Sequence, residues 1–155
     1  MDVNEENGLV RRARVNDLDR ILELDRVEPV GHARQELLTD RVHSGEVIVF
    51  GHEDQLSGFV VARRRAFFGR DFVELLSVSN NARRHGIGSA LLNAAVAQSS
   101  SARIFTSTNE SNTGMRALLA KAGWQLSGRL EGIDEGDPEM VYFTDARLAA
   151  AFGGE

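Results

Sequence analysis

Residues whose types and spacing suit anion binding gather between positions 83 and 89. Two arginines, Arg83 and Arg84, precede two glycines, Gly86 and Gly88, at the start of a helical pattern of apolar residues. Glycine lets a ligand approach the backbone, and the first N–H groups of a helix lack partners within it. The helix dipole adds positive charge there. The stretch predicts a phosphate-binding loop, with a glycine-started helix and a solvated basic turn as the plainer alternative.

The spacing of the glycines restricts the kind of phosphate site. A Walker loop requires Gly-Lys-Ser/Thr, yet the only lysine of the chain is Lys121. A dinucleotide fingerprint requires a third glycine where Leu91 stands, and it belongs in the first βα unit rather than mid-chain. The remaining form is Arg-x-x-Gly-x-Gly, carried by Arg83, Gly86 and Gly88.

The elements that must position this loop follow from apolar periodicity. Strand-length runs predict strands at Leu9–Arg14, Val47–Phe50, Phe59–Ala62, Phe72–Val78, Ile104–Thr108, Trp124–Leu130 and Met140–Phe143. Helical spacing predicts a helix capped by Asn16, one over His32–His43, one from Ile87, and one around Met115–Ala122 that Gly123 ends. The order β-α-α-β-β-β-α-β-α-β-β describes an α+β sheet with helices on both faces.

Composition narrows the class of protein. The 155 residues, of which 42% are hydrophobic and 26% charged, suit a single domain over 1–155. There is no cysteine, and the four histidines lack the spacing of metal ligands, so we expect neither disulfide nor metal. A net charge of −5 argues against nucleic-acid binding. Without a membrane-length apolar run or a signal-peptide pattern, we expect a cytoplasmic protein without membrane contact.

Three segments together resemble one known family. The loop at Arg83, Gly86 and Gly88 is similar to the coenzyme A pyrophosphate loop of the GNAT superfamily of N-acetyltransferases. The stretch from Asn112 to Trp124, with Lys121 and Gly123, resembles the second cofactor segment of that family, with Trp in place of Phe. The third match is the closing strand that runs from Gly136 to Phe143, and the element order agrees along nearly the whole chain.

The resemblance implies a fold and a reaction. It implies a mixed, mostly antiparallel sheet in which the strands Phe72–Val78 and Ile104–Thr108 form a parallel pair that splays to admit acetyl-CoA. The implied reaction is transfer of the acetyl group to a primary amine of a small molecule or peptide. A non-catalytic acyl-CoA-binding regulatory module is the alternative, and an O-acetyltransferase is a third reading. Family members also pair strands near the C-terminus between subunits, so a homodimer stays open.

The resemblance also implies which residues hold the cofactor. Backbone N–H groups between Arg84 and Ser89 would bind the pyrophosphate, and strand backbone near Val78 and Asn80 would pair with pantetheine and polarise the carbonyl. Asn112 would reach the cofactor through its side chain, with a helix cap as the alternative. The implied cofactor-binding residues are Val78, Asn80, Arg83, Arg84, His85, Gly86, Ile87, Gly88, Ser89 and Asn112.

Acetyl transfer to an ammonium requires a base and a proton for the leaving thiolate. Glu74 is the candidate base because it lies in an otherwise apolar strand, where burial raises a carboxylate pKa. A solvated strand position or an ion pair with an arginine is its alternative role. Further candidates are Glu28, His32, Glu131 and Glu139.

The usual acid of the family is absent from this sequence. Leu119 stands where the family often has a tyrosine, and the only tyrosine of the chain is Tyr142. Ser79, Ser107 or water would therefore have to protonate the leaving thiolate. A thiol of ordinary pKa, about 8.5, leaves tolerably well without an acid. The acidic turn from Glu131 to Glu139 could attract a cationic acceptor or form a solvated hairpin tip.

Overall fold

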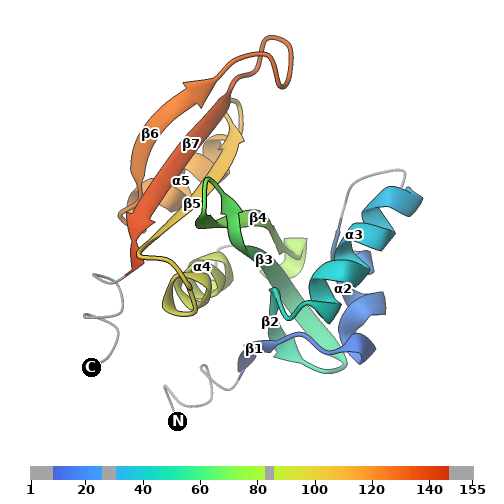
Figure 1. Ribbon diagram of the computed structural model, residues 1–155. Coiled ribbons are helices and arrows are strands. Elements are labelled where there is room, and N and C mark those ends of the chain that lie inside the picture. Colours follow the sequence, from blue (N-terminus) through green and yellow to red (C-terminus); the bar gives the residue numbers. More distant parts are fainter. Residues whose placement is uncertain (1–8, 26–30, 83–85, 147–155) are drawn as a thin grey trace. The chain divides into compact units, whose positions relative to one another are not determined.

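The computed structural model describes residues 9–25, 31–82 and 86–146, which form a mixed α+β fold (Figure 1). Its strands are β1 Val10–Arg12, β2 Val47–His52, β3 Gln55–Phe67, β4 Arg70–Val78, β5 Arg103–Asn109, β6 Gln125–Leu130 and β7 Glu139–Asp145. Its helices are α2 Leu18–Leu24, α3 His32–His43, α4 Ile87–Ala97 and α5 Thr113–Lys121, with 3₁₀ turns η1 Val15–Asp17 and η2 Asn80–Ala82. Within this part of the chain, no helix has the length and apolar character needed to cross a membrane.

The strands form one sheet in the order β1-β2-β3-β4-β5-β7-β6. β1 with β2, β2 with β3, β5 with β7 and β6 with β7 pair antiparallel. β4 and β5 pair in parallel, from Asp71 opposite Ile104 to Val73 opposite Thr106. The predicted mixed, mostly antiparallel sheet with one parallel pair is confirmed. Each predicted strand overlaps an observed one, although most bounds differ by one to several residues.

The chain divides into two compact units, each described by itself below. The first unit comprises Met1–Arg63 and Leu75–Ala95, and the second comprises Arg64–Glu74 and Val96–Glu155. Strands β3 and β4 run through both units, so each unit contains part of the sheet.

In the first unit, helices lie on both faces of the sheet. α2 and α3 pack on the face formed by alternate residues of β2 and β3. This core cluster contains Ala13, Ile21, Leu24, Leu38, Val42, Val47, Val49, Leu56, Phe59 and Val61. The opposite face meets α4 at Gly58, where a Cβ would lie 3.1 Å from Cδ1 of Leu91. The expected placement of helices on both faces is therefore present within this unit.

The expected helix cap at Asn16 is wrong. Asn16 lies inside η1, and the residue that precedes α2 is Asp17, which is 1% exposed. The Asp17 carboxylate accepts hydrogen bonds from both terminal guanidinium nitrogens of Arg11 at 2.8 and 2.9 Å and from the backbone N–H of Arg14 at 2.7 Å. A carboxylate forms an ion pair with a guanidinium and an asparagine amide does not, which explains why Asp17 rather than Asn16 is buried next to Arg11.

In the second unit, β5, β7 and β6 lie side by side with α5 on one face (Figure 1). The side chain of Arg116 on α5 donates from Nε to the hydroxyl of Tyr142 on β7 at 3.0 Å, which identifies that face. Leu119 of α5 is fully buried and Trp124 is nearly so. Alternate residues of the strands point to the opposite face, where four phenylalanine rings follow one another in contact: Phe72, Phe67, Phe105 and Phe143.

Candidate functional site

The start of α4 has the backbone geometry of an anion-binding turn. Gly86 has φ +78°, a conformation that favours glycine, and its carbonyl accepts the N–H of Ala90 at 3.0 Å. A Cβ at Gly86 would meet no atom within 4 Å, so the space beside this backbone is open. The N–H groups of the first helical turn, from Ile87 to Ser89, have no partners within the helix. This described part of the loop is compatible with the predicted phosphate-binding role, which stays a prediction.

The three remaining loop residues, Arg83, Arg84 and His85, lie outside the described residues. Their predicted contribution of positive charge and backbone N–H groups stays a prediction.

Close packing behind the loop holds α4 in place. Ile87 is 7% exposed and Leu91 is fully buried. A Cβ at Gly58 of β3 would lie 2.8 Å from the carbonyl oxygen of Ser77 and 3.4 Å from Cγ2 of Ile87. Only glycine allows this approach, so Gly58 supports the loop from the strand beneath it. Sequence reasoning missed this role, although a glycine inside a strand pattern is a signal for it.

The predicted pantetheine-binding backbone lies at the end of β4. Val78 is the last residue of the strand and is half-buried, whereas Asn80 is exposed and begins η2. Between them, the N–H of Ser79 donates to the carbonyl of Ser57 at 2.8 Å, which fixes the strand end against β3. The pairing of Val78 and Asn80 with a cofactor stays a prediction.

Asn112 begins α5 as its N-cap. Its Oδ1 accepts the backbone N–H of Met115 at 3.1 Å, which is the capping alternative that the sequence left open. Among the described residues, its Nδ2 has no hydrogen-bond partner. One end of the amide is therefore used by the helix and the other remains for a ligand, so the predicted cofactor contact is compatible with the cap.

The end of α5 explains the rest of that sequence segment. Gly123 has φ +86°, its N–H donates to Ala120 at 3.1 Å, and the N–H of Trp124 donates to Leu119 at 3.0 Å. This is a Schellman motif, so the predicted terminal glycine is confirmed. The side chain of Leu119 is fully buried.

Glu74 lies on β4 in the second unit and is half-buried. It follows Phe72 by two residues, so its side chain leaves the strand on the face that carries the phenylalanine rings. The base role of Glu74 stays a prediction.

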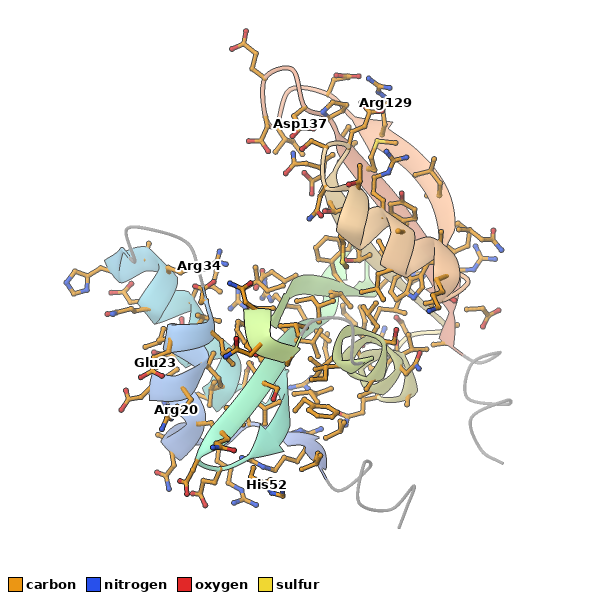
Figure 2. The ribbon with its side chains drawn as sticks, turned by 180° about the vertical axis from the view of Figure 1, so that it is seen from behind. Arg20, Glu23, Arg34, His52, Arg129 and Asp137 are labelled. Carbon is orange, nitrogen blue, oxygen red and sulfur yellow. The ribbon has the colours of Figure 1, made fainter. Side chains whose placement is uncertain are left out.

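Two of the four other candidate bases lie near the beginning of the chain. These two residues are Glu28 and His32. An ion pair nearby, 2.7 Å between the carboxylate of Asp25 and Nε of Arg34, joins the end of α2 to the first turn of α3 (Arg34 is labelled in Figure 2). Glu28, in the segment between them, lies outside the described residues. His32 is exposed and lines a surface pocket along α3 with Gln35, Glu36, Thr39 and Asp40.

The acidic turn between β6 and β7 is tied to the loop before α5. Nδ2 of Asn109 donates to Oδ2 of Asp134 at 2.8 Å and to the carbonyl of Asp137 at 3.0 Å. The carboxylate of Asp137 accepts the N–H of Ser111 at 3.0 Å and its hydroxyl at 2.5 Å. Figure 2 labels Asp137 at the hairpin turn and Arg129 nearby. The turn is therefore more than a solvated hairpin tip. The side chains of Asp134 and Asp137 hold the loop between β5 and α5, which leads to Asn112.

Two further acidic candidates differ in their surroundings. Glu131 is exposed and accepts from Nε of Arg129 at 2.7 Å. Glu139 is half-buried on β7, and its Oε1 accepts from the hydroxyl of Ser107 on β5 at 2.8 Å. Sequence reasoning named Ser107 and Glu139 separately but missed that they form a pair.

The two units hold different parts of the predicted site. The first contains Val78, Asn80 and the described loop residues Gly86, Ile87, Gly88 and Ser89. The second contains Glu74 and Asn112, together with the Ser107–Glu139 pair.

Comparison with known proteins gives one consistent answer. A family model described as "Acetyltransferase (GNAT) family" matches residues 15–124. An acetyltransferase of the GNAT family from Bacillus cereus is similar in structure, with a TM-score of 0.81 and 33% identity over 88% of this chain and 95% of that one. Comparison with curated protein sequences returns no match.

Two more distant structures share the fold. Arabidopsis thaliana NAA60, solved with a bisubstrate analogue, has a TM-score of 0.71 and 19% identity over 88% of this chain and 96% of its own. Ard1 from Thermoplasma volcanium has a TM-score of 0.74 and 16% identity over 88% of this chain and 95% of its own.

Proposed function

The chain belongs to the acetyltransferase (GNAT) family, and on that premise we propose that it transfers the acetyl group of acetyl-CoA to a primary amine of a small molecule or peptide. Membership of the family implies acetyl-CoA-dependent acetyl transfer. The choice of an amine as acceptor is the part that we propose. The observation that carries cofactor binding is the glycine turn at Gly86, which precedes α4 and follows β4 and η2 in the chain.

The described residues suggest how acetyl-CoA is held. The N–H groups of Ile87, Gly88 and Ser89 bind the pyrophosphate at the open turn beside Gly86. The backbone N–H near Val78 polarises the thioester carbonyl and stabilises the oxyanion that forms there. The free end of the Asn112 amide donates to the cofactor while the other end caps α5.

The chemical step requires a neutral amine. Glu74 accepts a proton from the acceptor ammonium, directly or through water, and the nitrogen lone pair then attacks the thioester carbonyl carbon. The new C–N bond forms, the C–S bond breaks, and coenzyme A departs as its thiolate. The nitrogen loses a second proton as the amide forms, and this proton goes to solvent because Glu74 already holds the first.

The thiolate leaves without an acid from α5. Leu119, at the position where family members often have a tyrosine, is fully buried and has no proton to give. With an ordinary thiol pKa of about 8.5, the thiolate is a tolerable leaving group near neutral pH and takes its proton from solvent.

The alternative is a non-catalytic acyl-CoA-binding module, which the absence of the acid at Leu119 favours. Release of free coenzyme A from acetyl-CoA distinguishes the two functions when amines, amino acids and peptides are added in turn. Acceptor-dependent release supports the enzyme. Tight acetyl-CoA binding without acceptor-dependent release from any amine would support the module instead.

A further inference from the structure

One face of the sheet in the second unit combines aromatic rings with carboxylates. The rings of Phe67 and Phe72 stack at 5.0 Å, those of Phe67 and Phe105 lie 5.2 Å apart, and those of Phe105 and Phe143 lie 5.6 Å apart. These rings are half-buried, and they lie on the side of the sheet opposite Tyr142, against which α5 packs. We call this the aromatic face.

The strand register places Glu74, Ser107 and Glu139 on this same face. Glu74 follows Phe72 by two residues and Ser107 follows Phe105 by two, while Phe72 and Phe105 are registered partners of β4 and β5. The hydrogen bond from Ser107 to Glu139 brings in β7. The face therefore carries, besides the rings, the carboxylate of Glu74 and the hydrogen-bonded pair of Ser107 and Glu139.

Glu139 is half-buried, whereas Glu131, Asp134 and Glu135 of its hairpin are exposed. Asp134 and Asp137 bind Asn109 and Ser111, and Glu131 binds Arg129. Glu139 accepts one hydrogen bond from Ser107, whereas a carboxylate offers about four lone-pair positions. Ser107 thus orients the carboxylate and leaves most of its acceptor capacity for a ligand.

The aromatic face already binds one cation of the chain itself. The guanidinium carbon of Arg103 lies 4.9 Å from the centre of the Phe143 ring, within the range of a cation–π interaction. This contact is independent of the carboxylates and shows that the Phe143 ring accepts a cationic group.

We propose that Glu139, oriented by Ser107, binds the ammonium group of the acceptor, while the rings of Phe105 and Phe143 contact its apolar part. This inference rests on the proposed function and names the acceptor class. Because the carboxylate of Glu139 repels a carboxylate next to the bound nitrogen, the acceptor is an amine with an apolar or aromatic body and no carboxylate beside the nitrogen. A free amino acid is a poor acceptor for the same reason.

The test compares two amines that differ by one carboxylate, 2-phenylethylamine and phenylalanine, in a coenzyme A release assay at neutral pH. We expect kcat/KM to be at least about tenfold higher for 2-phenylethylamine, because like charges across an interface are strongly unfavourable. Glu139→Gln should raise KM for 2-phenylethylamine by about tenfold, with little change in KM for acetyl-CoA. The variant should also reduce the ratio of kcat/KM for 2-phenylethylamine to kcat/KM for phenylalanine. Glu135→Gln, an exposed acid in the same hairpin, is the matched control and should change neither value.

The orienting role of Ser107 has its own variants. Ser107→Ala should raise KM for 2-phenylethylamine, and Ser107→Thr, which keeps the hydroxyl on a strand, should restore it. A rise in KM with alanine that threonine does not reverse would overturn the orienting role. Equal kcat/KM for the two amines, or a ratio that Glu139→Gln leaves unchanged, would overturn the inference.

Failure of the proposed function gives a different result. If no amine elicits coenzyme A release, the enzyme proposal fails, and binding of 2-phenylethylamine is then followed by the NMR shifts of the phenylalanine rings. Binding that weakens in Glu139→Gln but not in Glu135→Gln supports the cation site by itself. Absence of binding, or equal binding in both variants, overturns it.

Discussion

Asp137 in the β6–β7 turn accepts both the backbone N–H of Ser111, at 3.0 Å, and the hydroxyl of Ser111, at 2.5 Å. Ser111 immediately precedes Asn112, the N-cap of α5. The carboxylate thus connects the end of the hairpin to the residue that starts the helix and that we expect to contact the cofactor.

Removal of the Asp137 carboxylate should loosen this connection. We expect Asp137→Ala to lower the free energy of unfolding by about 1–3 kcal/mol, since two donors of Ser111 lose a charged acceptor. The variant should also weaken acetyl-CoA binding, because Asn112 loses its support. Urea unfolding and calorimetry measure the two effects, with Glu135→Ala as the control in the same turn. Equal unfolding energies for the two variants would contradict the prediction.

A side chain at Gly86 should interfere with the cofactor. Valine must adopt φ +78°, which costs about 1–2 kcal/mol, and its methyl groups occupy the open space beside the helix start. We expect Gly86→Val to weaken acetyl-CoA binding at least about tenfold, a loss of roughly 1.4 kcal/mol, as measured by calorimetry.

The matched control for that variant is Gly69→Val. Gly69 has φ +76° and equally open surroundings, but it lies in the turn between β3 and β4. It carries the same backbone strain without the cofactor contact. If both variants bind acetyl-CoA as well as the original chain does, the pyrophosphate assignment is wrong.

Glu74→Gln should separate chemistry from binding. The amide keeps the shape of the side chain but cannot accept the proton, so turnover of an amine acceptor should fall by about 10²-fold or more. Affinity for acetyl-CoA should stay nearly unchanged. Near-normal turnover at neutral pH would move the base role to another group, such as Glu139 on the same face.

The pH dependence of turnover should show no descending alkaline limb up to about pH 10, the usual pKa of tyrosine. The buried Leu119 cannot act as an acid, and the hydroxyl of Tyr142 accepts from Arg116 on the α5 face, opposite that of Glu74. A descending limb that Tyr142→Phe abolishes would make Tyr142 the acid. Leu119→Tyr would place a phenol at the position of the usual acid, but a larger side chain at this fully buried position costs about 1–3 kcal/mol in stability.

The Arg11–Asp17 ion pair should make stability depend on acid pH. The hydrogen bonds from Arg11 lower the pKa of Asp17, against the opposing effect of burial, so the folded chain binds fewer protons than the unfolded chain. The stabilisation is therefore complete above the unfolded pKa of about 3.9 and is lost as pH falls through the lower folded value.

We expect Asp17→Asn to cost about 3 kcal/mol at pH 7, the scale for breaking a buried pair, and this difference should shrink below about pH 4. Urea unfolding at several pH values measures it. Glu23→Gln, which breaks the exposed Arg20–Glu23 pair on α2 (Figure 2), is the control and should cost less than about 1 kcal/mol. A cost for Asp17→Asn that is independent of pH would refute the ion-pair explanation.

Features that depend on neighbours along the chain could be predicted from the sequence. Apolar runs between Phe72 and Val78 and between Ile104 and Thr108 indicated strands, which the structure confirms as β4 and β5. Their parallel pairing, also confirmed, was implied by the family resemblance. Gly123 was identified as a helix terminus because only glycine readily adopts φ +86°. The glycine turn at Gly86 follows from the same local restriction of backbone conformation.

Features that depend on residues far apart required the tertiary structure. Local pattern could not choose between Asn16 and Asp17, because the choice rests on the guanidinium of Arg11. Nor could it distinguish Asp137, which binds a serine 26 positions away, from Glu139, which binds Ser107 32 positions away. Both residues are simply acidic in the sequence. The fold brings each carboxylate to a different serine, since hydrogen bonding depends on distance in space and not along the chain.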